Sequence, residues 1–295
     1  MSDVLTADEV RRIGLNLCGF DDERQDRVRD KKNRERFHAH CGTSPLVVAV
    51  IWEDLLTTDL EAASVDPEED GTCIDHLFWA LCFLKCYPVE NVAEGSMKVC
   101  DKTFRKWVWF YIRKLYALRK LKIVMPKKWR TRFIFSVDGV HCPLNEPMHG
   151  EYSKNPAFMS HKFRSAGLDY EIAIDIFNNN CIWCNGPYRA GKNDISVFRD
   201  KLIHEIPLGK LVVADLECRR ERSVVTTPSS HDAKEVREFK SRSLAKHEKF
   251  NGKVKNFKSV SGRFRHGIKK HGLCFHAAVV VCQHQLENGS PLDPV

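Results

Sequence analysis

The chain has 295 residues, and 43% of them are hydrophobic, which is enough for one large domain or two modest domains and excludes a largely disordered protein. Its formal charge of +8 favours a polyanionic partner, although a solvated basic surface gives the same value. No apolar run approaches the roughly 18–20 residues that span a bilayer, and the first ten residues lack the pattern of a signal peptide, so we expect a soluble protein with no membrane partner. Twelve cysteines in such a chain predict reduced thiols rather than a disulfide framework.

The first half of the chain has helical periodicity. Residues 1–74 form a charged, helical N-terminal region in which no chemistry is visible. Residues 75–124 give an apolar helix that ends at Pro88, a short helix over 89–97 and a long helix over 99–120. Two helices, a turn and a third helix with a basic start indicate a helix-turn-helix DNA-binding segment, although a bundle with a purely structural role has the same periodicity. The residues expected to contact DNA there are Lys102, Thr103, Arg105 and Lys106.

After a basic connector at 125–132 the periodicity becomes that of strands. Residues 133–144, 169–177 and 181–189 are predicted strands, with a hairpin turn at 178–180. Asp194 is expected to cap a helix over 194–206. A fourth strand at 210–217, a short fifth strand at 223–228, a long helix from about 232 to 260 and a last helix over about 272–287 follow.

In two of these strands the apolar run ends in an acid. Asp138 follows the apolar run of the first strand and Asp215 that of the fourth, where an ionised carboxylate is costly to bury. Three antiparallel strands and a helical crossover place the fourth strand parallel to the first and beside it, which is the ribonuclease H arrangement. Two neighbouring carboxylates repel each other unless a cation lies between them, and Mg²⁺ or Mn²⁺ suits such oxygen ligands. The sequence therefore predicts a divalent-metal site at this sheet edge.

Several segments resemble one known family, in the family's order. They are residues 138–142, 160–163, 170–174, 185–194, 211–215, 246–251, 255–267 and 269–292. Over roughly 131–292 the chain resembles the DDE superfamily endonuclease domain of Harbinger-like transposases, and residues 83–109 resemble the helix-turn-helix segment that precedes it. The resemblance implies a ribonuclease H-like α/β fold, a mixed sheet with flanking helices, preceded by a small all-α helix-turn-helix domain.

The same resemblance implies an activity and a set of ligands. It names Asp138, Asp215 and Glu248 as catalytic acids that hold two Mg²⁺ or Mn²⁺ ions and cleave or transfer DNA phosphodiesters. It also implies a nuclear location, self-association and a separate DNA-binding partner protein. From the residues alone the third acid is open between Glu248 and Glu238; helical geometry places Glu248 on one face with Asn251 and Lys255, away from the apolar stripe.

The long helix is rich in basic residues, and such a face favours contacts with a phosphate backbone. The residues expected to contact DNA on and after this helix are Lys246, Lys249, Lys253, Lys255, Arg263 and Arg265.

The chain departs from the family after the second acid. Members usually carry a glycine and an aromatic residue there, whereas this chain has Leu216, Glu217 and Cys218. Glu217 lies on the same side of the strand as Asp215 and either joins the site or disturbs it. An alternative function is therefore a catalytically inactive, domesticated transposase-like DNA-binding protein.

A third interpretation is a zinc or redox protein built on Cys181 and Cys184. Two buried structural cysteines account for this pair more simply, because the other candidate ligands have no regular spacing. Those candidates are His271, Cys274 and His276.

Overall fold

The computed structural model describes residues 4–20, 27–58, 73–145, 155–215, 221 and 223–295. The chain forms two compact units: Met1–Lys122 with Asn256–Val260 and Leu273–Ser290, and Ile123–Lys255 with Ser261–Gly272 and Pro291–Val295. The predicted helix-turn-helix segment lies within the first unit, and most of the predicted endonuclease domain lies within the second. Across the described residues, every helix is too short or too polar to cross a membrane.

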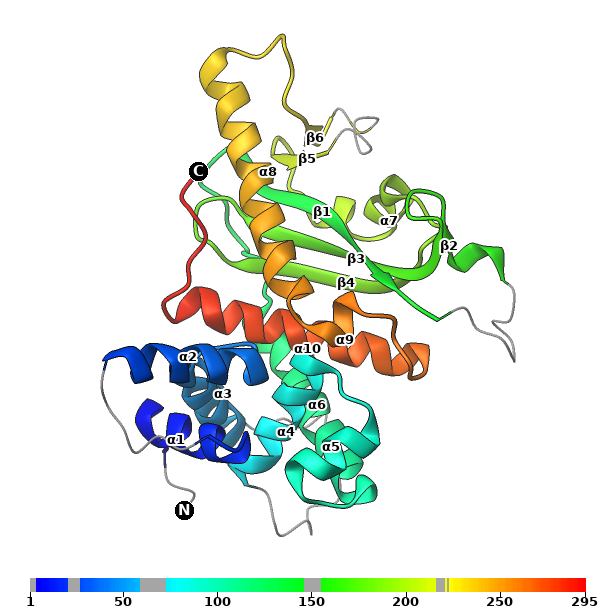
Figure 1. The fold of residues 1–295 in the computed structure, drawn as a ribbon. Coiled ribbons are helices and arrows are strands. Elements are labelled where there is room, and N and C mark those ends of the chain that lie inside the picture. Colours follow the sequence, from blue (N-terminus) through cyan, green and yellow to red (C-terminus); the bar gives the residue numbers. More distant parts are fainter. Residues whose placement is uncertain (1–3, 21–26, 59–72, 146–154, 216–220, 222) are drawn as a thin grey trace. The chain divides into compact units, whose positions relative to one another are not determined.

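The first unit contains the helices of the N-terminal half (Figure 1). They are α1 (Ala7–Leu17), α2 (Arg27–Cys41), α3 (Pro45–Thr57), α4 (Ile74–Cys86), α5 (Glu90–Met97) and α6 (Asp101–Lys122). Local signals set their ends: Thr6 and Glu9 form a capping box at the start of α1, and Tyr87 adopts a left-handed conformation (φ 49°) that ends α4 before Pro88. The three helices predicted between residues 75 and 120 are confirmed.

The second unit is built on a mixed six-stranded sheet. Its strands are β1 (Phe133–Pro143), β2 (Met159–Ser160), β3 (Ser165–Asp175), β4 (Cys181–Arg189), β5 (Leu211–Ala214) and β6 (Val225–Thr226). Their order is β2-β3-β1-β5-β6, and β4 also pairs with β3. Strand β3 is antiparallel to both β1 and β4, whereas β5 is parallel to β1. The predicted strand pairing is therefore confirmed, and β2 is a short addition that the sequence did not indicate.

Three details of the predicted helices are corrected. Helix α7 (Asp194–Asp200) is capped by Asn193, whose side chain accepts a hydrogen bond from the Ser196 backbone N–H, so Asp194 is the first helical residue rather than the cap. The single helix expected from 232 to 260 is α8 (Lys234–Lys255) followed by the short α9 (Lys258–Ser261). The last helix, α10, covers Ile268–Glu287 and so begins four residues earlier than expected.

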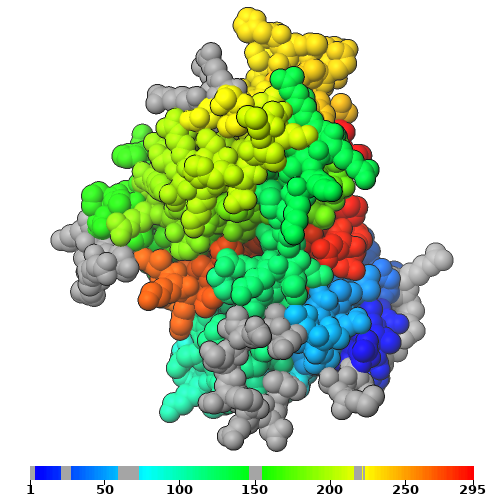
Figure 2. All heavy atoms as spheres, turned by 180° about the vertical axis from the view of Figure 1, so that it is seen from behind, coloured from blue at the N-terminus to red at the C-terminus, as the bar shows by residue number. Residues whose placement is uncertain are grey.

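Helices cover both faces of the sheet. Alternation along β1 sends Phe135 and Val137 into a core with Phe198 of α7. The yellow-green segment around residue 200, which includes the end of α7, lies at the surface in the view from behind in Figure 2. Ser136 and Asp138 contact α8 on the other face, which is turned toward the viewer in Figure 1.

Hydrogen bonds fix α8 on the sheet. The Ser136 hydroxyl bonds Nδ1 of His247 at 2.9 Å, and both side chains are buried. Burial lowers the pKa of His247 to about 3, so this imidazole is neutral. The neighbouring Lys246 is also buried, and its Nζ donates to the carbonyl oxygen of Ile176.

Ser136→Ala is expected to lower the free energy of unfolding by about 1–3 kcal/mol, because it leaves Nδ1 of buried His247 without a partner. Urea unfolding followed by circular dichroism measures the change. The matched control is Ser230→Ala at an exposed position, which should stay within about 0.5 kcal/mol of the parent. Equal effects of the two substitutions would show that the Ser136–His247 bond does not hold the helix.

Candidate metal centre

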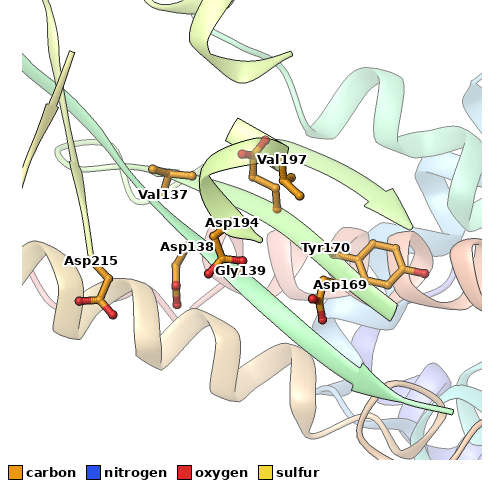
Figure 3. Close-up of a pocket in the computed structure, with 9 residues that line it drawn as sticks. Val137, Asp138, Gly139, Asp169, Tyr170, Asp194, Val197 and Asp215 are labelled. Atoms are coloured by element: carbon orange, nitrogen blue, oxygen red, sulfur yellow. The ribbon is translucent and has the colours of Figure 1, made fainter. Parts of the chain in front are cut away.

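Strands β1 and β5 place two aspartates side by side. Asp138 lies in β1, one residue after Val137, which pairs with Ala214 at the end of β5. Asp215 is the residue that follows Ala214, so the two acids lie beside each other on neighbouring parallel strands, Asp138 in the middle of β1 and Asp215 just past the end of β5 (Figure 3). The prediction that the topology brings these two acids together is confirmed.

The surroundings of Asp138 disfavour its ionised form. Its pKa is raised to about 6, mainly by burial, and the charges of Glu248 and Asp215 raise it further. The backbone N–H of Gly139 and the ammonium group of Lys162 act in the opposite direction. Asp138 is thus a half-buried carboxylate whose close neighbours include two more acids.

Glu248 reaches this site from α8. It lines the same cleft as Asp138, Asp215 and Asn251. Glu238 is not among the residues that line the cleft; it lies ten residues earlier, about 15 Å along the helix axis. Of the two glutamates left open by the sequence, the structure places Glu248 at the site.

Asn251 connects α8 directly to the first acid. Its Nδ2 donates to Oδ2 of Asp138 at 3.0 Å, and its Oδ1 is buried with no hydrogen-bond partner among the described residues. The sequence placed Asn251 on the face of Glu248 but gave it no role. A role for Asn251 could have been inferred from its position three residues after Glu248, because this spacing puts both side chains on one helical face.

A fourth carboxylate borders the site at Gly139. A β-carbon at position 139 would lie 3.0 Å from Oδ1 of Asp194, so the absence of a side chain at Gly139 lets this carboxylate approach β1 closely. Figure 3 shows the Asp194 side chain beside Gly139 and next to Asp138. The sequence had indicated Asp194 as a helix cap alone.

A fifth carboxyl group, that of Glu171, is buried in β3 next to this cluster. Burial raises its pKa to about 7, and the charge of Asp194 adds to the effect. Trp183 Nε1 donates to Glu171 Oε2 at 2.9 Å and opposes the shift. Sequence reasoning did not single out Glu171, since a polar residue in an alternating strand normally faces solvent.

The cleft around these acids has a volume of about 370 Å³, and its wall carries both basic and acidic side chains. Lys162, Lys192 and Lys255 lie along it together with the carboxylates. His141 also lines it, but Nδ1 of its ring bonds Oδ1 of Asp169 at 2.7 Å and the ring stacks on Phe163. These contacts fix the imidazole in the wall and suit a structural role.

The donor atoms fit a hard divalent cation. Three carboxylates and the partnerless amide oxygen of Asn251 are oxygen ligands, which Mg²⁺ and Mn²⁺ prefer. The pKa of Asp138 is raised mainly by burial, with smaller contributions from the charges of Glu248 and Asp215, and a bound cation would favour its ionised form. Glu217, the additional acid considered from the sequence, lies outside the described residues, as do Leu216 and Cys218.

The basic residues expected to contact DNA differ in their environments. Lys255 lies in the cleft wall, Lys253 is partly exposed, and Arg263 and Arg265 are exposed. Lys249 is exposed and pairs with Asp293. Lys246 is a correction: it is buried and bonded to a backbone carbonyl, so it holds α8 on the sheet and presents no charge to a phosphate.

Some of the residues expected to contact DNA at the start of α6 are already engaged by other side chains. Arg105 forms a two-point ion pair with Glu90 and a further contact with Asp101. Lys102 and Lys106 are exposed, and the hydroxyl of Thr103 lies 3.1 Å from the thiol of Cys100.

The cysteine pair weighed from the sequence lies in β4 and not at the start of a helix. Cys181 is buried and its thiol donates to the carbonyl oxygen of Trp183. Within the described ranges, neither Cys181 nor Cys184 belongs to a group of three potential metal ligands. The structure thus gives no support to a redox or zinc role for this pair.

Comparisons of the chain with protein-family models, curated proteins and solved structures give no match. The site itself is therefore the basis for inferring function.

The stability that Asp138 and Glu171 contribute is expected to fall as the pH rises from about 4 to about 7 when divalent ions are absent. Their folded-state pKa values of about 6 and about 7 lie above the ordinary values of 3.8 and 4.5, so each of these two groups holds more protons in the folded state than in the unfolded state in this window. Buried His247 and His271, whose pKa values are lowered to about 3, act in the opposite direction, so the difference between the parent and Asp138→Asn isolates the contribution of the acid. Mn²⁺ should raise the melting temperature more at pH 7.5 than at pH 5, because its ligands must be ionised.

Thermal unfolding at each pH, with and without Mn²⁺, measures this effect. In Asp138→Asn the Mn²⁺ effect should be lost, whereas the control Glu238→Gln should behave as the parent. An equal Mn²⁺ effect in the parent and Asp138→Asn would contradict the assignment.

Proposed function

We propose that this chain is a transposase-derived DNA endonuclease that cleaves or transfers phosphodiesters with divalent metal ions. The observation that carries the proposal is the convergence of Asp138, Asp215 and Glu248, from β1, the end of β5 and α8, on one cleft. Three acids from segments far apart in the sequence are hard to explain by packing, because burial and the charges of the two neighbouring acids both disfavour the ionised form of Asp138.

The strand pairing supports the same proposal. Antiparallel β4-β3-β1 followed by a parallel β5 beside β1 is the pattern of a ribonuclease H-like sheet. The sequence motifs that resemble Harbinger-like transposases include the segments that supply all three acids.

Each residue of the site has a role in this mechanism. Bound Mg²⁺ or Mn²⁺ ions, two by analogy with the family that the sequence resembles, would supply activation of the attacking hydroxyl and stabilisation of the leaving oxygen. Asp138, Asp215 and Glu248 are the residues that would hold them. Asn251 orients Asp138 through its hydrogen bond, and a pKa of about 6 leaves Asp138 mostly ionised at neutral pH.

The cleft wall suits a nucleic-acid substrate. Lys162, Lys192 and Lys255 line the cleft together with the acids and would offer positive charge to backbone phosphates; Lys192 also pairs with Asp200. On this proposal the partner is DNA in the nucleus, and joining two DNA ends calls for self-association or a separate DNA-binding protein.

A second candidate function is a catalytically inactive DNA-binding protein that keeps a transposase-like fold. The observation that favours it is the replacement of the usual glycine and aromatic residue after Asp215 by Leu216, Glu217 and Cys218. This change lies next to a catalytic acid and leaves the basic residues of the cleft in place.

Nicking of supercoiled plasmid in Mn²⁺ separates the two candidates. The endonuclease should nick DNA, and Asp138→Asn, Asp215→Asn and Glu248→Gln should each lower the rate at least about 100-fold, because each removes a ligand charge. The control Glu238→Gln should retain the parent rate. DNA binding without nicking in the parent, under any divalent ion, would establish the inactive binder instead.

Lys162→Ala and Lys255→Ala are each expected to reduce DNA affinity for all sequences alike. Each loses about one phosphate contact, so the slope of log affinity against log salt should become shallower by about 1. Fluorescence anisotropy with a labelled duplex at several salt concentrations measures the slope. The control is Lys246→Met, which removes a buried charge and should leave the slope unchanged; a change as large as that of Lys255→Ala would contradict the assignment.

A further inference from the structure

A second cluster of potential metal ligands lies in the first unit. One side-chain nitrogen of His40 and the sulfur atoms of Cys82 and Cys86 all lie within 4.8 Å of one another. Nitrogen and thiolate sulfur are soft ligands, unlike the oxygen ligands of the carboxylate cleft.

Helical geometry explains why these side chains meet. Cys82 and Cys86 are four residues apart on α4, so their side chains lie one above the other on the same face. His40 is the second-last residue of α2, and Cys86 is the last residue of α4. The thiol of Cys86 donates to the carbonyl oxygens of Ala39 and His40 at 3.5 and 3.8 Å, which places its sulfur against the end of α2.

Two more thiols border this group. Cys18 is the C-cap residue of α1, and burial raises its pKa to about 11, with a further contribution from Cys86. Cys41 follows His40 and is buried. All of these cysteines are thiols, and no disulfide joins any of them. Cys18 lies outside the group of three whose ligand atoms are all within 4.8 Å of one another, but its charge interacts with that of Cys86 and it comes from a third helix. It is the candidate for a fourth ligand that a side-chain rotation would bring to the ion.

The cluster is partly open to solvent. Cys82 is 7% exposed, whereas His40 and Cys86 are accessible. An ion can therefore enter from the surface and still have one ligand within the core. Tetrahedral Zn²⁺ with Zn–S of about 2.3 Å and Zn–N of about 2.0 Å brings ligand atoms to within about 3.3–3.8 Å of one another, which small side-chain rotations achieve here.

We propose that His40, Cys82 and Cys86 bind one zinc ion, with Cys18 as the fourth ligand. Binding replaces the S–H bonds of the three cysteines by Zn–S bonds and releases three protons to solvent, and no group is oxidised or reduced. The ion links α1, α2 and α4, so its role is to stabilise the first unit. This zinc site is independent of the carboxylate cleft and of the endonuclease function proposed for that cleft.

The test uses the full chain, purified without a histidine tag and under reducing conditions. Elemental analysis should find about one zinc per chain. After metal removal, Co²⁺ should give the intense visible absorption of a tetrahedral site together with thiolate-to-cobalt charge transfer. Absence of zinc, combined with only the weak absorption of octahedral Co²⁺, would overturn the proposal.

Variants assign the ligands. His40→Ala and Cys86→Ala should each weaken Zn²⁺ binding by about 10-fold or more, measured by competition with a chromophoric chelator. Cys18→Ala should lower the charge-transfer intensity by about one third, since one of three thiolates is lost. The matched control is Cys100→Ala, an exposed cysteine beside Thr103 outside the cluster, which should bind zinc as the parent does.

If Cys86→Ala fails to fold, Cys86→His is the variant to test, because histidine keeps a metal ligand at position 86. It should retain tetrahedral Co²⁺ absorption with fewer thiolate bands. Loss of zinc affinity in Cys100→Ala equal to that in Cys86→Ala would overturn the assignment. Asp138→Asn should leave zinc binding unchanged, so failure of this proposal and failure of the endonuclease proposal are distinguishable.

Discussion

The position of α8 across β1 is the constraint on which the candidate metal centre depends. Two of the hydrogen bonds that fix it join Ser136 to His247 and Asn251 to Asp138. Glu248 lies between the two helical residues that make these bonds, so its side chain is held at the cleft without an anchor of its own. A shift of α8 by one residue would rotate Glu248 by about 100° and remove it from the cleft.

The fixed helix and the sheet together place carboxyl groups where their ionised forms are disfavoured. Burial and neighbouring acids raise the pKa of Asp138 to about 6, and burial raises that of Glu171 to about 7. A protein gains nothing in stability from such a cluster, since each added charge disfavours the others. A divalent cation bound between the carboxylates would attract each of them and favour their ionised forms. The cluster is therefore best explained as a metal-binding site.

Much of this centre was predictable from local sequence patterns. Apolar runs that end in Asp138 and Asp215, with a helical crossover between their strands, sufficed to place the two acids together, and helical periodicity put Glu248 and Asn251 on one face. The proximity of Asp194 to Gly139 was not predictable, because it depends on how a loop returns to the sheet. The burial of Lys246 was missed because its partner is a backbone carbonyl 70 residues away in the chain.

Anomalous diffraction from crystals grown with millimolar Mn²⁺ tests the central claim most directly. We predict at least one anomalous peak between Asp138 and Asp215, about 2.0–2.6 Å from their carboxylate oxygens, with Glu248 or the Asn251 amide oxygen within reach. A map with no peak in this cleft would contradict the account.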